Sequence, residues 1–458
     1  MTTKMKKYQQ LNRTLFLAGL LFLGASCSGI LDEKPDKALI VPTTISELWA
    51  LLDNNLQVMN AEPSQLDASS DDVVILDSRL SVLDEDSRRI YTWSREPINS
   101  AMNTDWSRPY DQVFFSNVVL GELEQFGNSE KSTPEWRNLK GSAHFYRAYA
   151  FFSLARSFCL GYDPQTASNE LGIVLRVDSD IAVSLPRATL KETFEQIIQD
   201  LDTAEPLLPE TASVNTRPSK AAVWAMLSRV YLYMGNFEKS LEAADRALNL
   251  YDTLLDYNLI NPSPARPFVG NLDEVIFYSE LLLRTYYFFS AGSAISPELY
   301  AKYEEDDLRR SLFFFPRAGL MAFRGQYAYL ANAFGGLAVD ELWLNKAECE
   351  VRMGQTQRAA NSLNTLLAKR FKTGTFIPVT ELNSEALLEK VLEERRKELV
   401  LRGMRWGDIK RLNVLGGNIS LSRIINGEEI RLPEGDLRFA LPIPQDEIDR
   451  SGIRQNPR

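Results

Sequence analysis

The chain has 458 residues, 45% of them hydrophobic and 24% charged, which is enough for a large folded core or for several lobes. Its formal net charge is −10 at pH 7. An acidic surface repels a phosphate backbone over most of its area, so this charge argues against nucleic acid as a partner.

The N-terminal residues 1–26 have the layout of a secretory signal. Basic residues in MTTKMKKYQQLNR precede the apolar run LFLAGLLFLG, which is too short to cross a bilayer as a permanent helix. Cys27 follows Ala25 and Ser26, at the place where a lipoprotein signal is cleaved and its cysteine acylated. We therefore predict a lipoprotein signal peptide over residues 1–26 and lipidation at Cys27. The alternative is an ordinary cleaved signal with an incidental cysteine.

Irregular sequence follows over residues 60–115, and again over residues 252–336. Both segments are rich in Pro, Asn, Ser and aromatic residues and lack a sustained helical period, as in NPSPARPFVG and RTYYFFSAGSAISPELY. They are too long to be simple connectors. We predict that they form an irregular lobe on a rigid scaffold, which is where binding residues usually lie.

Between and after these segments, apolar residues recurring every 3.6 positions predict three helical pairs. The first joins residues 135–159 to 190–208 through an irregular loop. The other two, AAVWAMLSRVYLYMGNFEKSLEAADRAL and ELWLNKAECEVRMGQTQRAANSLNTLLAKR, superpose on Gly235 and Gly354. In each, glycine permits a left-handed turn and small residues permit close helix approach, as in tetratricopeptide-like units.

A further helix is predicted to begin at an N-cap, Ser384, and to run into EERRKELVLRGMRWGDIKRL at residues 393–412. This stretch carries seven Lys or Arg residues in twenty positions, which in isolation suggests a nucleic-acid-binding helix. Acidic residues are interleaved, however, so opposite charges fall within one or two helical turns. We predict that these charges pair inside the protein and that Gly403 allows a break.

Cysteine and histidine usage restricts the chemistry. Cys159 and Cys349 lie in apolar helical contexts, which favours buried free thiols over a disulfide. His144 is the only histidine, so any site that needs two is excluded. We expect a half-exposed helix position for His144 and predict no catalytic residue, no cofactor and no metal ligands.

In their order along the chain, several short motifs resemble the SusD-like (SusD/RagB) family of nutrient-binding outer-membrane lipoproteins, over nearly the whole length. The motifs are Cys27-Ser28 with Ile30-Leu31-Asp32 and Pro35; Trp106 with Tyr110 and Asn117; Lys140-Gly141 leading into Phe145-Tyr146-Arg147-Ala148-Tyr149; Asn271-Leu272-Asp273-Glu274-Val275-Ile276-Phe277; Glu341, Leu344 and Ala347-Glu348; Glu394-Arg395-Arg396, Glu398, Arg405-Trp406 and Asp408; Leu441-Pro442-Ile443-Pro444; and Gln455-Asn456-Pro457.

The resemblance implies a mainly α fold, with a tetratricopeptide-like helical-pair scaffold and an irregular ligand-binding lobe. It implies one domain over residues 27–458: scaffold at about 30–60, 110–250 and 337–412, irregular segments at about 60–110 and 252–336, and a tail at 413–458. It also implies a cell-surface protein anchored by lipid to the outer membrane. Such a protein acts as the capture subunit and lid of a SusC-like TonB-dependent transporter and has no chemistry of its own.

A glycan ligand would need flat aromatic faces together with carboxylates, amides and guanidinium groups. The irregular segments supply these groups, and we predict ligand-binding roles for Asp72, Arg79, Trp93, Asn99, Tyr287 and Tyr327. Trp106 is expected to be a core residue.

Three alternatives remain open at this stage. The ligand could be a peptide or another oligomer. A glycoside hydrolase would use two carboxylates, but 61 acidic residues make some pair inevitable, so their abundance is uninformative. A lipid-anchored tetratricopeptide scaffold for protein interaction would be expected to lack aromatic-rich lobes.

Overall fold

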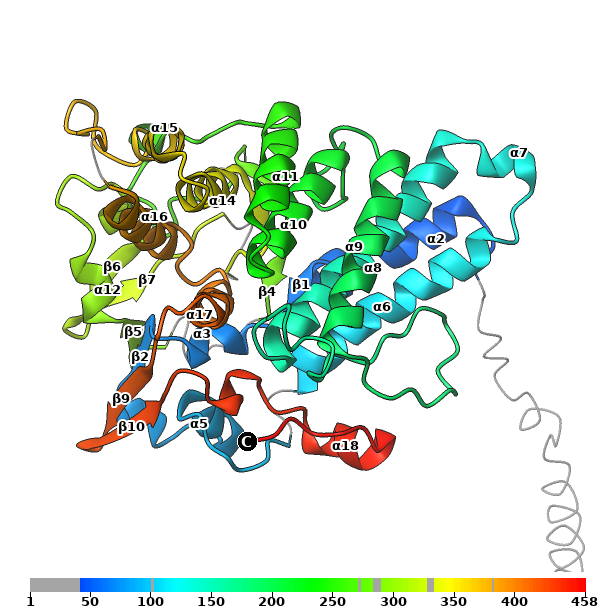
Figure 1. Cartoon of the computed structure of the whole chain (residues 1–458), viewed down its shortest axis with the longest axis horizontal. Coiled ribbons are helices and arrows are strands. Elements are labelled where there is room, and N and C mark those ends of the chain that lie inside the picture. The colour runs from blue at the N-terminus through cyan, green and yellow to red at the C-terminus, as the bar shows by residue number, and fades with distance from the viewer. Residues whose placement is uncertain (1–41, 100–102, 271–272, 283–289, 328–332, 381–382) are drawn as a thin grey trace, which may run out of the picture. The chain divides into compact units, whose positions relative to one another are not determined.

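The computed structural model describes residues 42–458, apart from 100–102, 271–272, 283–289, 328–332 and 381–382. The predicted signal and Cys27 lie outside the described residues. Helices dominate the fold, as predicted (Figure 1). They include α2 (Ile45–Leu52), α6 (Asn103–Leu123), α7 (Asn128–Lys131), α8 (Pro134–Phe158), α9 (Leu190–Ala204), α10 (Lys220–Tyr233), α11 (Phe237–Leu250), α14 (Val339–Arg352), α15 (Thr356–Leu367), α16 (Ser384–Glu398), α17 (Arg405–Val414) and α18 (Gln445–Ser451). Within this described part, no helix is long and apolar enough to cross a membrane.

The three predicted helical pairs are present as α8 with α9, α10 with α11, and α14 with α15. Gly235 and Gly354 lie at the turns of the second and third pairs with φ of 73° and 76°. This left-handed conformation is open to glycine and strained for most other residues. In Figure 1 the helices follow one another from α6, α8 and α9 through α10 and α11 to α14–α16. The tetratricopeptide-like scaffold is therefore confirmed.

Helix α6 begins at Asn103, inside the segment 60–115 that the sequence predicts to be irregular. Pro109 lies within the helix. Proline disfavours a helix interior because it removes one backbone hydrogen bond, so the sequence here does not look helical. Tertiary packing outweighs this loss. The ring of Trp106 is buried as predicted and meets Phe158 of α8 edge-on, with 5.0 Å between ring centroids.

Helix α16 is capped one residue earlier than predicted. The side chain of Asn383, and not that of Ser384, accepts a hydrogen bond from the Ala386 N–H at 2.8 Å. After Glu398 the chain breaks, with Leu401 and Gly403 at φ of 54° and 71°, before α17 begins. The predicted break at Gly403 is confirmed.

Parts of the two irregular segments lie together in one lobe that has its own apolar core (left of Figure 1). Short strands from residues 61–75 pair with strands from residues 280–295, which joins parts of the chain some two hundred residues apart. The pairs are β1 (Ala61–Glu62) parallel to β4 (Glu280–Leu281), and, antiparallel, β2 (Val73–Ile75) with β5 (Ser293–Ile295), β3 (Val275–Phe277) with β8 (Leu337–Ala338), β6 (Phe314–Arg317) with β7 (Leu320–Phe323), and β9 (Leu421–Ile425) with β10 (Glu428–Leu432). Short helices α3 (Gln65–Ser69), α4 (Asp77–Leu80), α5 (Glu85–Tyr91), α12 (Pro297–Ala301) and α13 (Arg309–Leu312) connect them.

Buried ion pairs join this lobe to α16. Arg309 of α13 contacts Glu394 at 2.6 Å and Glu398 at 2.9 Å, and all three side chains are fully buried. Arg309 also contacts Asp307 at 2.7 Å, and Lys397 of α16 reaches the same aspartate at 2.9 Å. Charges withdrawn from water are tolerated only when they are paired and hydrogen-bonded, so these contacts fix the lobe against the helix.

The remaining basic residues of 393–412 are also engaged within the protein, as predicted. Their partners are Asp408 for Arg395, Asp72 for Arg396, Asp340 for Arg402, Asp71 for Arg405, and Glu348 for Arg411. The Lys410 ammonium donates to the backbone carbonyls of Arg156 and Cys159 at the end of α8. The basic stretch is thus a structural element.

We expect Arg309→Ala to lower the free energy of unfolding by about 3–5 kcal/mol, because it leaves three buried carboxylates short of a cation. Urea denaturation would measure this loss. Arg431→Ala is the matched control, because that side chain is 71% exposed. Its effect should stay within about 0.5 kcal/mol, and equal effects of the two substitutions would contradict the structural role of Arg309.

The ion pairs of Asp408 with Arg395 and Arg411 make the free energy of unfolding depend on pH. Burial would raise the pKa of Asp408, but the guanidinium groups of Arg395 and Arg411 outweigh it and hold the pKa at about 2, below the ordinary 3.8. Because the pKa is lower in the folded state, the carboxylate stabilises folding above about pH 4, and this contribution is lost as the pH falls towards 2. The destabilisation caused by Asp408→Asn should therefore shrink between these pH values in urea titrations. A constant difference would count against the ion pairs.

Candidate functional site

Arg79 lies on α4 at the surface of the lobe, directly after β2. A Cβ on Gly292, just before β5, would lie only 2.3 Å from the Cβ of Arg79, so glycine lets the chain pass close to the arginine stem. The half-buried guanidinium has no hydrogen bond or ion pair with any described residue, and its buried Nε has no partner. Buried polar groups are normally satisfied, so an unsatisfied donor of this kind is suited to a ligand.

Arg317 of β6 approaches the same turn, and its guanidinium donates to the carbonyl of Ser293 at 3.2 Å. Beside it, the half-buried ring of Phe315 lies 5.5 Å from the guanidinium. This part of the lobe therefore combines cationic donors with a partly accessible aromatic ring. These are residue types that bind sugar hydroxyls and sugar C–H faces.

Asp72 lies nearby but is buried, and its Oδ1 accepts a hydrogen bond from Arg396 Nε at 2.7 Å. Its backbone carbonyl accepts a hydrogen bond from the Ser296 N–H. Burial raises the pKa of Asp72 in spite of Arg396. These contacts tie β2 to α16 and β5, which is a structural role.

Trp93 is buried, and its backbone is left-handed with φ of 51°. Its indole N–H donates to the carbonyl of Ser69 at 2.8 Å, and the guanidinium of Arg423 covers one ring face at 4.4 Å. A cation in this position occupies the face that a sugar would use. The predicted stacking platform is therefore a core side chain in this structure, and Arg423, from the distant β9, is the partner that sequence reasoning missed.

Tyr327 is also fully buried, between the rings of Phe268 and Phe334. Its hydroxyl lies 2.8 Å from that of Tyr257 and 3.3 Å from Asp340 Oδ2. It offers no face to solvent in this structure.

The other two predicted ligand residues are not enclosed in this way. Asn99 is exposed, and its backbone N–H donates to Asp86 Oδ2 at 3.0 Å. Tyr287 lies outside the described residues. Of the six predicted binding residues, Arg79 and Asn99 are the described ones that a ligand could reach.

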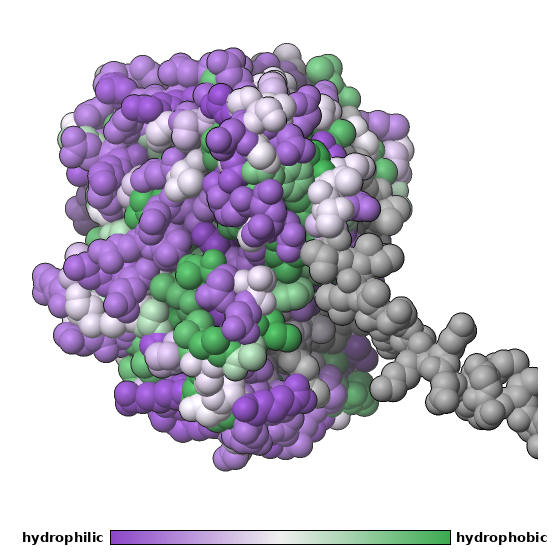
Figure 2. All heavy atoms as spheres, turned by 90° about the vertical axis from the view of Figure 1, so that its right-hand side faces the viewer, coloured by the Kyte–Doolittle hydropathy of each residue, from purple (hydrophilic) through white to green (hydrophobic). Residues whose placement is uncertain are grey.

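A groove lies on the helical side of the molecule, between α6, residues 174–185 and α18, with a volume of about 300 Å³. Trp106, Tyr110 and Phe114, spaced four residues apart on α6, line it. Figure 2, which faces this end, shows hydrophobic residues gathered on the lower half of the face. The sequence does carry this signal, because aromatic residues at four-residue spacing share one helix face.

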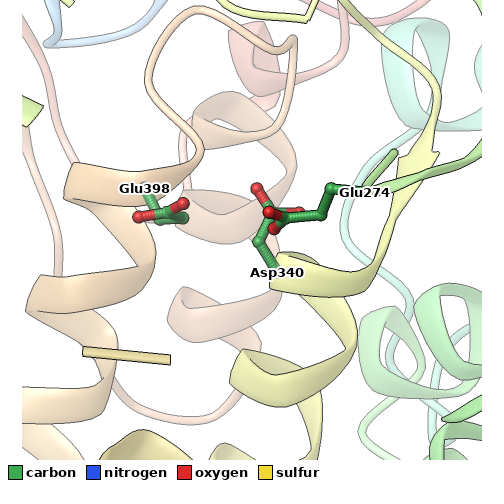
Figure 3. A group of neighbouring side chains, drawn as sticks. All are labelled: Glu274, Asp340 and Glu398. Carbon is green, nitrogen blue, oxygen red and sulfur yellow. The ribbon is translucent and has the colours of Figure 1, made fainter. Parts of the chain in front are cut away.

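Three acidic side chains, Glu274, Asp340 and Glu398, converge in the interior, with one oxygen of each within 4.8 Å of the others (Figure 3). Arg370 bridges Glu274 and Glu398 at 2.7 Å each, and Arg402 contacts Asp340 at 2.6 Å. Burial raises the pKa of Glu274 to about 8, although Arg370 opposes it. Guanidinium groups thus already occupy the carboxylates, so we assign the cluster to the interior ion-pair network.

His144 and the cysteines have structural surroundings. His144 Nδ1 lies 2.8 Å from Asp200 Oδ1, and Arg147 contacts the same carboxylate at 2.6 Å. The histidine is half-buried, as expected. Cys159 and Cys349 are buried free thiols, as predicted.

Comparison with known proteins agrees with this architecture. A family model described as starch-binding associating with outer membrane matches residues 30–232, and the SusD family model matches residues 340–458. SusD-like protein P2 of Formosa agariphila is 24% identical over 419 residues, covering 77% of this chain and 79% of that protein.

Solved structures share the fold. A SusD superfamily protein from Bacteroides thetaiotaomicron has a TM-score of 0.72 at 22% identity, covering 90% of this chain and 98% of the other. A SusD-like carbohydrate-binding protein from Bacteroides vulgatus has a TM-score of 0.68 at 19% identity, covering 90% and 97%. The chain is therefore similar to SusD-like proteins over most of its length, and members of that family are binding proteins associated with the outer membrane.

If the Glu274–Asp340–Glu398 cluster is held by guanidinium groups alone, divalent cations should not affect stability. We expect the melting temperature to change by less than about 1 °C on adding EDTA or millimolar CaCl₂, because a bound ion would stabilise the folded state by mass action. Differential scanning fluorimetry would measure this. A stabilisation by Ca²⁺ that Asp340→Asn abolishes would contradict the assignment.

Proposed function

We propose that this protein is a surface-exposed lipoprotein that captures a glycan and passes it to a SusC-like TonB-dependent transporter, acting as its lid. The family description, which refers to starch and to the outer membrane, supports the glycan and the location. The anchor would be the acylated Cys27, and the face carrying Arg79 would receive the ligand.

The observation that carries the proposal is the guanidinium of Arg79, which has no partner within the described residues, on a lobe in which Asp72 and Arg309 are ion-paired. The ion pairs to α16 hold the lobe in one position, so Arg79 is presented without a large ordering cost when a ligand binds. Arg317 and Phe315 beside it add donors and a ring. Tyr287 and Asn99 remain predicted contributors.

A peptide or another oligomer is the alternative ligand for the same site, because guanidinium groups also bind carboxylates. The matched families are families of binding proteins, which supports a role without catalysis. A pure interaction scaffold is less well supported, because the lobe forms a separate apolar core and a surface of its own.

The soluble form that starts after Cys27 should bind at least one polysaccharide in a panel of neutral and acidic glycans and peptides, measured by isothermal titration calorimetry. Arg79→Ala should weaken that binding about tenfold or more, since charge-assisted hydrogen bonds contribute about 1.5–3 kcal/mol. Asn99→Ala should weaken it less.

Arg246→Ala is the matched control, because Arg246 is a half-exposed arginine on α11 of the scaffold. Its binding should equal that of the unmodified protein. Unchanged affinity of Arg79→Ala would contradict the proposed ligand site at Arg79. Hydrolysis of a panel member by the pure protein would contradict a role without catalysis. Binding of peptides alone would favour a peptide as the ligand.

A further inference from the structure

The groove between α6 and α18 is separate from the face that carries Arg79. Its floor is the aromatic stripe of α6, in which Phe114 is half-buried, and its walls are residues 174–185 and α18. Its volume of about 300 Å³ lies at the lower limit of small-ligand pockets, roughly 300–1,000 Å³. The groove therefore fits one or two side chains better than a long oligomer.

The wall formed by residues 174–185 has a rigid base. Asn117 Nδ2 donates to the carbonyls of Arg176 and Asp178 at 3.0 and 2.7 Å, and Arg147 donates to that of Val177 at 3.1 Å. The Tyr110 hydroxyl donates to the Val174 carbonyl at 3.1 Å. The segment is thus held on α6 and α8, and its tip is presented in a defined position.

The tip of this segment is apolar and exposed. Ile181 is 73% exposed, and Val177 and Val183 are 47% and 46% exposed. A single exposed aliphatic residue is ordinary, but three on one short segment are less so, and one of them, Ile181, lines the groove itself. Figure 2 shows such apolar surface gathered on this face.

The groove is also acidic. Asp178 on one wall and Glu447 on the other form no ion pair within the described part of the chain, whereas Asp111 on α6 lies 3.9 Å from Arg108. Of the described residues that line the groove, Arg176 is the one cationic side chain, and it donates to the carbonyl of Asp180. Among the described residues, the groove therefore combines an apolar surface with two carboxylates that form no ion pair.

We propose that this groove binds a polypeptide segment that inserts an apolar side chain and carries Lys or Arg on either side of it. The apolar tip and aromatic floor would cover the inserted side chain, and Asp178 and Glu447 would pair with the flanking cations. An anionic lipid surface has the wrong charge for this rim. Neutral sugars would leave the carboxylates without countercharge. The site is independent of glycan capture by the lobe.

The test uses the soluble chain that starts after Cys27 and a fluorescein-labelled peptide, Lys-Lys-Leu-Trp-Leu-Lys-Lys, in fluorescence anisotropy. We expect saturable binding that weakens with added NaCl, and at least about tenfold weaker binding of the matched peptide with Glu in place of every Lys. Equal binding of the two peptides, or no binding of the Lys peptide, would overturn the proposal.

Two pairs of substitutions locate the site. Ile181→Ser with Val183→Ser should weaken binding of the Lys peptide about tenfold. Asp178→Asn with Glu447→Gln should weaken it several-fold and remove most of its salt dependence. Ile377→Ser is the control, because Ile377 is 84% exposed and does not line the groove, and it should leave binding unchanged. Unaltered binding in both paired variants would refute the assignment.

Two further probes distinguish other occupants. Co-sedimentation with phosphatidylcholine vesicles, with and without phosphatidylglycerol, should show no binding that depends on Ile181 and Val183. A loss of vesicle binding in the Ile181→Ser, Val183→Ser variant would point to a membrane instead and overturn the proposal. Loss of glycan binding in that variant would also overturn the proposal, because the groove would then contribute to glycan capture. Because Arg79→Ala should leave binding of the Lys peptide intact, failure of either site can be recognised separately.

Discussion

Pairing of the buried cations of α16 and α17 is the constraint on which the rest of the structure depends. A charge removed from water needs a partner of opposite sign nearby, and the partners come from widely separated parts of the chain: Asp71 and Asp72 from the N-terminal irregular segment, Asp307 from the second, and Glu348 from the scaffold. The positions of these segments are therefore linked to one helix. This arrangement explains how a lobe built from two-stranded ladders can be held rigidly on stacked helices.

Because so many charges are paired inside the protein, the described charged side chains that form no ion pair are informative. Arg79 on the lobe and Asp178 and Glu447 in the α6–α18 groove are opposite in sign and lie in different parts of the molecule. Opposite charge favours different partners at the two surfaces. The two proposed recognition sites therefore differ in setting, one on irregular chain and one between helices.

Aromatic composition alone could not distinguish ligand-binding side chains from core side chains. Trp93 and Tyr327 lie in segments of the right character, but a ring that is suited to stacking on a sugar is equally suited to a protein core. Arg423 decides the environment of Trp93, and it follows some 330 residues later in the chain. Contacts over that separation have no local signature. The groove on α6 was visible in sequence only as a stripe of aromatic residues, because its walls come from two other regions.

By itself, the sequence determined the helical pairs, the glycines at their turns, the break at Gly403, the free thiols and the internal use of the basic stretch. Each depends on local periodicity, on backbone freedom or on the cost of burying charge, and these are properties of neighbouring residues. Only the tertiary structure decided which side chains face solvent. It placed Asp72, Trp93 and Tyr327 inside, left Arg79 without a partner among the described residues, and put an acidic, apolar groove between α6 and α18. The physical reason is that exposure and pairing are set by residues that come together only when distant segments pack.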